Sequence, residues 1–274
     1  MSAVKQDTED GSSVYNVKWV GVEGVDYAVV MQNHNGPCPL LAVVNALLLR
    51  GQIVLKRDCV KINENVLIQL VADCIVRLRP DDLDESEISN YEKNVSDVLT
   101  LIPSLSKGLD VNVFFTGVHK FEYTAACALF DVLNIPLLHG WIADPENQEM
   151  VQTMDGLSYN RLVEKLVSDG NEYEKSLLQS FLDSSPSQLT IKGILDLQSR
   201  LRDGEIAVLF RNNHFHTLSK NKNVLYVLVT DSGFLTETEI MWETLESTDG
   251  NCVLVDASFN MPHHTSSFVS ETAE

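Results

Sequence analysis

The sequence predicts an α+β fold, and three observations support this prediction. Residues 38–201 contain several segments whose apolar positions recur at helical spacing. After residue 205, apolar and β-branched side chains instead run or alternate as they do in strands. The chain has 274 residues, of which 44% are hydrophobic and 22% charged, so it is long enough for one large domain or two small ones with a sizeable core. A helical first part followed by a β-rich second part is typical of an α+β domain.

The chain begins with two predicted strands. Residues 14–20 and 27–31 are rich in apolar and β-branched side chains and flank Gly24, where we expect a turn. Residues 1–13 are expected to form a flexible leader, residues 14–262 the folded domain, and residues 263–274 a disordered tail.

A helix is predicted to begin at Cys38. Pro39 is expected at its first position, where the missing N–H is harmless, and Gly51 follows the last apolar residue, where a left-handed residue ends many helices. Apolar side chains cover most of its circumference, so we expect it to be deeply buried. They are Leu40, Leu41, Val43, Val44, Leu47 and Leu48.

The later elements follow from the same patterns. Further helices are predicted at residues 65–78, 91–101, 124–133, 159–167, 173–182 and 189–201. Strands are predicted at residues 109–115, 137–142, 205–210, 214–219 and 224–231, with a hairpin turn at 220–223. Residues 81–87 form an acidic loop, and Ser187 is the expected N-cap of the helix at 189–201.

Composition excludes several classes of protein. The formal net charge of −19, with no cluster of Lys or Arg, argues against nucleic-acid binding. No apolar run approaches the roughly 20 residues that span a bilayer, and the polar start of the chain predicts no secretory signal. The five cysteines are widely spaced without a C-x-x-C pair, so we expect no metal site and no cofactor. We expect reduced thiols and a cytoplasmic location, with the nucleus as an alternative.

Cys38 is the candidate nucleophile. It stands where a polar loop rich in Gly and Pro meets the predicted helix, and the positive end of the helix dipole favours its thiolate. The remaining cysteines lie in or beside apolar runs and are expected to be small buried residues. The alternative for Cys38 is that it, too, is a buried core residue without a chemical role, since most cysteines are buried and inert.

A cysteine nucleophile needs a base, which is usually a histidine from elsewhere in the fold. His214 and His216 stand at the start of a predicted strand, where papain-type proteases present their imidazole, and both point to one face if the strand is regular. The boundary between loop and strand at Asn213 favours His214. The alternative is that both histidines are surface residues without a catalytic role.

Two further roles belong to such a site. Gln32 precedes Cys38 by six residues, the offset at which papain-type enzymes place a side-chain donor for the oxyanion. A group that orients the imidazole is expected from the next strand, where His214 would lie opposite Val229 or Thr230. Thr230, Asp231 and Asn212 all remain candidates for the residue that holds the ring. A slip of one residue in the strand register would move each side chain to the other face of the sheet.

These segments resemble the MINDY family of deubiquitinases. Residues 32–49 contain the family's pattern Q-N-x-N-G-P-C-P-L-L-A, and residues 210–218 contain R-N-N-H-F. Residues 109–123 match with Phe-Thr-Gly-Val at 115–118. The other similar stretches are His-Gly-Trp at 139–141 and residues 228–235. The resemblance covers residues 14–260. It implies a papain-like cysteine protease fold, with the nucleophile on a buried central helix and the histidine on an antiparallel β-layer. It also implies residues 14–262 as a catalytic domain that hydrolyses lysine-48-linked polyubiquitin.

Carried onto this sequence, the resemblance implies Cys38 as nucleophile, His214 as base and Gln32 as oxyanion donor. It further implies contacts with ubiquitin at Asp110, Val111, Trp141, Tyr159 and Phe210, for whose aromatic members core packing is the alternative. Tyr15 matches a position linked to holding the site inactive.

The sequence departs from the family at two positions. His34 stands where the family commonly has an acidic residue, and His216 where it has a small hydroxyl residue. The expected partners are ubiquitin and its lysine-48-linked chains, with no nucleic acid and no membrane, and the protein is expected to be a monomer. Two other functions remain: a catalytically silent ubiquitin-binding module, and an ordinary papain-type peptidase or acyltransferase.

Overall fold

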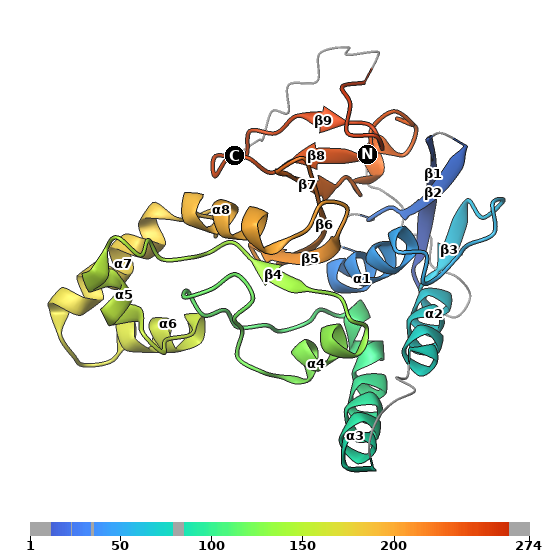
Figure 1. The fold of residues 1–274 in the computed structure, drawn as a ribbon. Helices are drawn as coiled ribbons and strands as arrows, with labels where there is room; N and C mark the ends of the chain where they lie inside the picture. Colours follow the sequence, from blue (N-terminus) through green and yellow to red (C-terminus); the bar gives the residue numbers. More distant parts are fainter. Residues whose placement is uncertain (1–11, 23, 34–35, 79–84, 263–274) are drawn as a thin grey trace.

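The computed structural model describes residues 12–22, 24–33, 36–78 and 85–262 (Figure 1). In this part of the chain, eight α-helices, two short 3-10 helices and two β-sheets confirm the α+β prediction. The predicted leader falls mostly, and the predicted tail entirely, outside the described residues. None of the described helices is long and apolar enough to cross a membrane.

The smaller sheet holds the N-terminal strands. Its order is β2-β1-β3, and both pairings are antiparallel. Its strands are β1 (Val14–Val22), β2 (Val25–Val30) and β3 (Lys61–Asn63). Gly24 between β1 and β2 has φ +84°, a left-handed value that glycine adopts without strain, so the predicted turn is confirmed.

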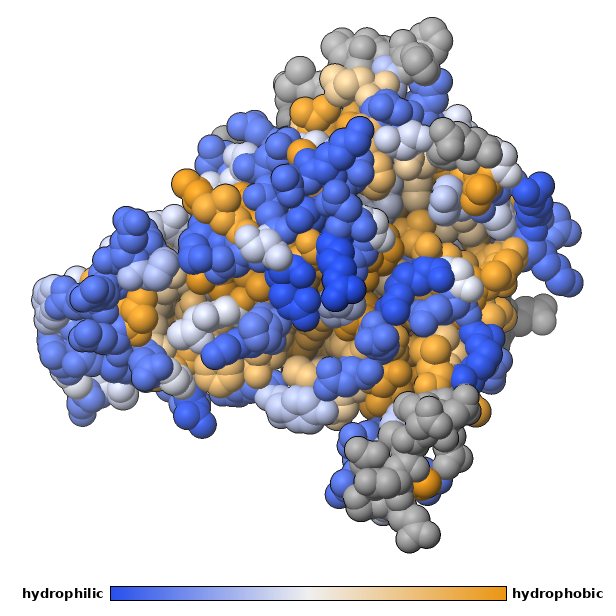
Figure 2. All heavy atoms as spheres, viewed as in Figure 1, coloured by the Kyte–Doolittle hydropathy of each residue, from blue (hydrophilic) through white to orange (hydrophobic). Residues whose placement is uncertain are grey.

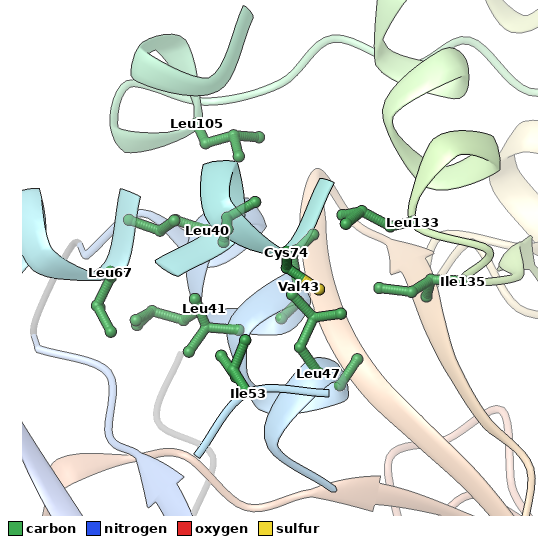
Figure 3. Close-up of a cluster of buried hydrophobic side chains, with 14 of the residues drawn as sticks. Leu40, Leu41, Val43, Leu47, Ile53, Leu67, Cys74, Leu105, Leu133 and Ile135 are labelled. Atoms are coloured by element: carbon green, nitrogen blue, oxygen red, sulfur yellow. The ribbon is translucent and has the colours of Figure 1, made fainter. Parts of the chain in front are cut away.

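Helix α1 (Cys38–Leu49) is the centre of the molecule. Every residue from Pro39 to Leu47 is buried, and Gly51 after the helix has φ +66°. Figure 3 shows its leucines and Val43 packed among side chains of other elements. These neighbours come from α2 (Glu64–Arg77), the 3-10 helix η1 (Ile102–Ser106) and the segment after α4 (Ala125–Val132); they include Leu67, Cys74, Leu105, Leu133 and Ile135. The predicted deep burial is confirmed.

The larger sheet has the order β4-β5-β6-β7-β8-β9, with β4 parallel to β5 and every other pairing antiparallel. Its strands are β4 (Leu137–His139), β5 (Ile206–Arg211), β6 (His214–Asn221), β7 (Val224–Leu228), β8 (Trp242–Thr244) and β9 (Leu254–Val255). Lys222 and Asn223 have φ of +48° and +66°, which is the backbone of a two-residue type I′ hairpin turn.

The helices that follow β4 and precede β5 in the chain form a lobe at the left of Figure 1. It contains α5 (Gln148–Met154), α6 (Tyr159–Val167) and α7 (Glu172–Ser184), and α8 (Ile191–Arg200) joins it to the large sheet. Most of the lobe surface that faces the viewer in Figure 2 is hydrophilic. Phe115, Trp141 and Phe181 belong to the hydrophobic cluster of this lobe. Helix α5 was not predicted from the sequence.

Several predictions differ from the structure. Helix α3 (Glu85–Leu101) begins at Glu85, so the expected acidic loop at 81–87 is helical at its end, and residues 81–84 lie outside the described residues. The side chain that caps α8 belongs to Thr190 rather than to Ser187: its Oγ1 accepts from the Gly193 N–H at 3.0 Å. Of the four cysteines expected to be buried, only Cys74 is buried; Cys59 and Cys127 are half-buried and Cys252 is exposed.

The segment 109–115 does not form the predicted strand. Its backbone groups bond to several segments in turn rather than to one ladder: Phe114 N–H donates to Lys120, the Val113 carbonyl accepts from Tyr159, and the Phe115 carbonyl accepts from Ala143. Isolated bridges join it to Phe121 and Ser158. The alternation of apolar residues is therefore real, but it serves packing between helices rather than strand pairing.

Candidate active site

Cys38 is the first residue of α1 and is half-buried. Pro39 is consequently at the second helical position, one later than expected, and Pro37 precedes the helix. Burial raises the pKa of the Cys38 thiol, and the backbone N–H groups of Phe215 and of Cys38 itself offset this only in part. The net shift favours the protonated thiol, because desolvation outweighs these donors.

His214 is the first residue of β6 and is exposed. The turn before it, Asn212-Asn213, has φ of +51° and +58°, which asparagine tolerates better than most residues. The ring centroids of His214 and His216 are 6.2 Å apart, so the two imidazoles share a face, as predicted.

The opposite face of β6 contacts α1. Phe215 packs in the core cluster around α1, and the Thr217 hydroxyl donates to the Ala42 carbonyl at 3.2 Å. The backbone N–H of Phe215 lies next to the Cys38 sulfur. Cys38 and the residue after His214 are thus brought together, but among the described contacts no hydrogen bond joins the Cys38 thiol to the His214 imidazole.

Gln32 lies where the loop before α1 meets the large sheet. Its backbone N–H donates to the Thr230 carbonyl at 2.6 Å, and its position forms a parallel bridge with Asp231. Its side-chain Nε2 donates to the Gly36 carbonyl at 3.2 Å. Gln32 therefore presents an amide donor within the loop that leads to Cys38. His34, in the same loop, lies outside the described residues.

A pocket of about 370 Å³ adjoins Gln32 and His214. Its lining residues are Gln32, Asn33, His214, His216, Val227, Leu228, Val229, Thr230, Asp231, Ser232, Phe234 and Glu243, and Cys38 is not among them. The pocket therefore borders the candidate base and the candidate oxyanion donor, but not the candidate nucleophile.

Two titratable side chains that line this pocket, His216 and Glu243, have displaced pKa values. Burial, together with smaller contributions from the charges of His214 and Arg211, lowers the pKa of His216 to about 4. Burial raises the pKa of the Glu243 carboxyl, against which Cys252 and Arg211 act. His216 is therefore a neutral imidazole at neutral pH.

The residue that orients His214 is not identified by these contacts. If the register of β6 and β7 is continued, His214 lies opposite Asp231 rather than opposite Val229 or Thr230, because the turn is centred on Lys222-Asn223. The Asp231 carboxylate accepts from the Gly233 N–H at 2.6 Å, and the Asn212 N–H donates to the Gln188 side chain at 3.0 Å. Within the described ranges, none of the three candidate residues hydrogen-bonds to the imidazole.

The positions that resemble ubiquitin contacts differ in exposure. Trp141 is 5% exposed, and its indole N–H donates to Ser185 Oγ at 2.7 Å, so its side chain belongs to the core. Tyr159 is 38% exposed, and its ring lies 5.5 Å from that of Trp141. Asp110 is exposed. Val111 and Phe210 are partly buried against the core around α1.

Tyr15 is buried in the core cluster around α1. Its side chain is 1% exposed, and its hydroxyl donates to Glu64 Oε2 at 2.6 Å. Burial and this carboxylate raise its pKa far above the ordinary value.

Two buried polar residues were missed at the sequence level. The Asn45 side chain, in the middle of α1, is 0% exposed and bonds to both backbone groups of Val30. His139 is 1% exposed; its Nδ1 accepts from the Trp141 N–H at 3.2 Å. A lone asparagine inside an apolar helix was the signal available for Asn45, because a buried amide needs partners. Among the described residues, no three His, Cys, Asp or Glu side chains are grouped to hold a metal.

Comparison with known proteins gives a consistent match. The model of a family described as MINDY deubiquitinase matches residues 13–259. The human ubiquitin carboxyl-terminal hydrolase MINDY-1 is 42% identical over 255 residues, covering 91% of this chain and 54% of the relative. The human ubiquitin carboxyl-terminal hydrolase MINDY-2 is 42% identical over 265 residues, covering 94% of this chain and 43% of the relative. The chain spans about half the length of the curated relatives it matches.

Proposed function

The chain belongs to the MINDY deubiquitinase family, and we propose on this premise that it is a thiol-dependent deubiquitinase that hydrolyses the isopeptide bonds of lysine-48-linked polyubiquitin. The observation that carries the proposal is the juxtaposition of Cys38, at the start of a buried helix, with the backbone of Phe215, directly after His214. Gln32, six residues before Cys38, supplies an amide donor in the same loop.

In the proposed reaction, His214 accepts the proton of Cys38 and the thiolate attacks the carbonyl carbon of the C-terminal glycine of ubiquitin. Gln32 Nε2 and the Cys38 backbone N–H stabilise the oxyanion. His214 then gives the proton to the leaving lysine nitrogen as the C–N bond breaks, and water hydrolyses the thioester. We extend the proposal to a papain-like arrangement, in which α1 carries the nucleophile and the antiparallel β6 carries the base.

The proposed partner is a ubiquitin chain that binds a monomer of this protein. Asp110, Val111, Tyr159 and Phe210 are the proposed contacts, because each has accessible side-chain surface. Trp141 is assigned an indirect role, in which it supports Tyr159 from the core. The free thiols of all five cysteines favour a reducing compartment, so we propose the cytoplasm, with the nucleus as a second location.

A linkage panel tests this proposal. Di- and tetra-ubiquitin of each linkage are incubated with the parent protein, with Cys38→Ala and with Gln32→Glu, a variant of similar side-chain size that lacks the amide donor. The parent is expected to cleave lysine-48-linked chains preferentially and Cys38→Ala to cleave none. Gln32→Glu is expected to be about 100- to 1000-fold slower, as for loss of one oxyanion donor. Cleavage by Cys38→Ala at the parent's rate would refute the mechanism.

One alternative is favoured by a specific observation. The raised pKa of Cys38, and the hydrogen bond of its thiol with a backbone N–H, also suit a ubiquitin-binding module that is catalytically silent. This alternative predicts that chains bind without cleavage at high protein concentration. Cleavage of unrelated peptides would instead favour an ordinary papain-type peptidase.

A further inference from the structure

We propose that the pocket beside His214 and Gln32 receives the side chain of the lysine that leaves during isopeptide cleavage, and that Asp231 is the residue that selects for this amine. This inference rests on the proposed function and assigns a specificity-determining role that the resemblance did not imply. We call this cavity the leaving-lysine pocket; its lining residues are those given above for the pocket of about 370 Å³.

The residues that line the pocket suggest that it binds the leaving lysine rather than the ubiquitin C-terminus. After acyl transfer, the ubiquitin acyl group stays on the Cys38 sulfur, whereas the departing nitrogen must lie within hydrogen-bond reach of the acid that protonates it. That acid is His214 in the proposed mechanism. His214 and Gln32 line the pocket and Cys38 does not, so a side chain that occupies it contacts the proposed acid rather than the sulfur that keeps the acyl group.

The walls of the pocket suit a lysine side chain. Val227, Val229 and Phe234 contribute apolar surface to it, which matches the four methylene groups. If the register of β6 and β7 is continued beyond its last pair, Leu218 and Val227, Val229 lies opposite His216 and Asp231 lies opposite His214. A chain of methylenes that starts at a nitrogen beside His214 therefore meets apolar surface, and its nitrogen stays near the carboxylate of Asp231.

The two carboxylates of the pocket are not equivalent. Glu243 is partly buried, contacts the Cys252 sulfur at 3.5 Å and interacts with the charge of Arg211, so its charge already has a cationic neighbour. Asp231 is exposed, and one of its oxygens accepts from the Gly233 N–H. Among the described residues, Asp231 has no ion-pair partner. It is thus the carboxylate that is available to an incoming cation.

The bond changes are balanced without any further reactant. The C–N bond of the tetrahedral intermediate breaks, the sulfur keeps the acyl group, and the nitrogen takes one proton from the His214 imidazolium. The neutral amine then takes a second proton from water and becomes an ammonium ion. Asp231 stabilises the positive charge that develops on this nitrogen, since charge-assisted hydrogen bonds are the stronger ones.

The test compares two reactions that share the acyl side but differ in the leaving group. One is cleavage of lysine-48-linked diubiquitin; the other is labelling by a ubiquitin derivative with a C-terminal alkyne, from which no amine departs. Asp231→Asn is expected to lower kcat/KM for diubiquitin about tenfold, as for the loss of a charge-assisted hydrogen bond, and to leave the labelling rate unchanged. Asp231→Glu is expected to restore most of the cleavage. Glu239→Gln, an exposed carboxylate of the same region outside the pocket, is the control with the same change in charge and is expected to match the parent in both reactions.

Two results would overturn the inference. Equal losses of cleavage and labelling in Asp231→Asn would show that Asp231 orients His214 rather than recognises the amine. Unchanged cleavage in Asp231→Asn would show that it does neither. Failure of the parent protein to cleave diubiquitin or to be labelled would refute the proposed function itself, so the two failures are distinguishable.

Discussion

The side chain of Asn45 makes two hydrogen bonds with the backbone of Val30. Its Oδ1 accepts from the Val30 N–H at 2.8 Å, and its Nδ2 donates to the Val30 carbonyl at 3.0 Å. Asn45 lies two turns into the helix that begins at Cys38, and Val30 ends the strand that leads to Gln32. This one buried amide therefore holds the candidate nucleophile's helix and the candidate oxyanion donor's strand in a fixed relation.

We expect Asn45→Leu to lower the free energy of unfolding by at least about 2 kcal/mol, because two buried backbone groups of Val30 lose their partners. Urea unfolding followed by circular dichroism measures this change. Gln69→Ala, which removes an exposed side-chain contact with Asp73 on α2, is the control and should stay within about 0.5 kcal/mol of the parent. Equal stability of Asn45→Leu and the parent would contradict the role of this amide.

The resting thiol of Cys38 should react slowly with small alkylating agents. Burial raises its pKa, so the thiolate fraction at neutral pH is small, and the rate of iodoacetamide modification should still be rising above pH 8. Because no hydrogen bond links it to His214 in the described contacts, His214→Ala should leave this rate unchanged. Mass spectrometry of the Cys38 peptide provides the measurement. A rate plateau below pH 7 that His214→Ala abolishes would reveal a thiolate–imidazolium pair in the free protein.

Stability should fall on acidification through His139. Burial lowers its pKa from 6.5 to about 4, so the unfolded chain binds a proton more readily than the native protein between these two values. The contribution is fully present above pH 6.5 and is lost as the pH falls toward 4, by about 2 kcal/mol at pH 5. His139→Asn retains an acceptor near Nδ1 but does not titrate. The free energy of unfolding, measured between pH 8 and pH 5, should fall less in this variant; identical slopes would exclude His139 as the source.

Substitutions of Trp141 and Tyr159 should have different effects on stability and on ubiquitin binding. Trp141→Ala removes a ring that packs on Phe115 at 5.2 Å and on Phe181 at 5.9 Å, so it should lower the free energy of unfolding by about 3–5 kcal/mol. Tyr159→Ala removes a partly exposed ring and should change stability less while it weakens ubiquitin binding. Urea unfolding and calorimetric titration with diubiquitin supply the two readouts. A stable Trp141→Ala variant that has lost only binding would contradict the assignment of Trp141 to the core.

The sequence predicts α1 well because its signals are local. Pro39 restricts the backbone at the start of the helix and Gly51 supplies a left-handed residue after its end, whichever partners pack around them. The same holds for the hairpin between β6 and β7, whose turn needs left-handed residues at Lys222 and Asn223. The turn is centred one residue later than expected, on Lys222-Asn223, and the continued register then pairs His214 with Asp231. Local sequence patterns alone do not fix a register to one residue.

The remaining features depend on contacts that are distant in sequence. Residues 109–115 alternate like a strand, but their backbone partners come from several separate segments. Asn45 is recognisable as an unusual residue in an apolar helix, yet its partner, Val30, is set by how α1 packs on β2. The protonation of Cys38 likewise follows from burial in the folded protein, which outweighs the favourable helix end that the sequence displays.

In the proposed reaction, everything depends on Cys38 acting as the nucleophile of a ubiquitin hydrolase. The most direct measurement is labelling of the protein by ubiquitin that carries a C-terminal electrophile, followed by mass spectrometry of the adduct. We expect a single adduct on Cys38 in the parent protein, none in Cys38→Ala, and strongly slowed formation in His214→Ala. An adduct on another cysteine, or equal labelling of Cys38→Ala, would contradict it.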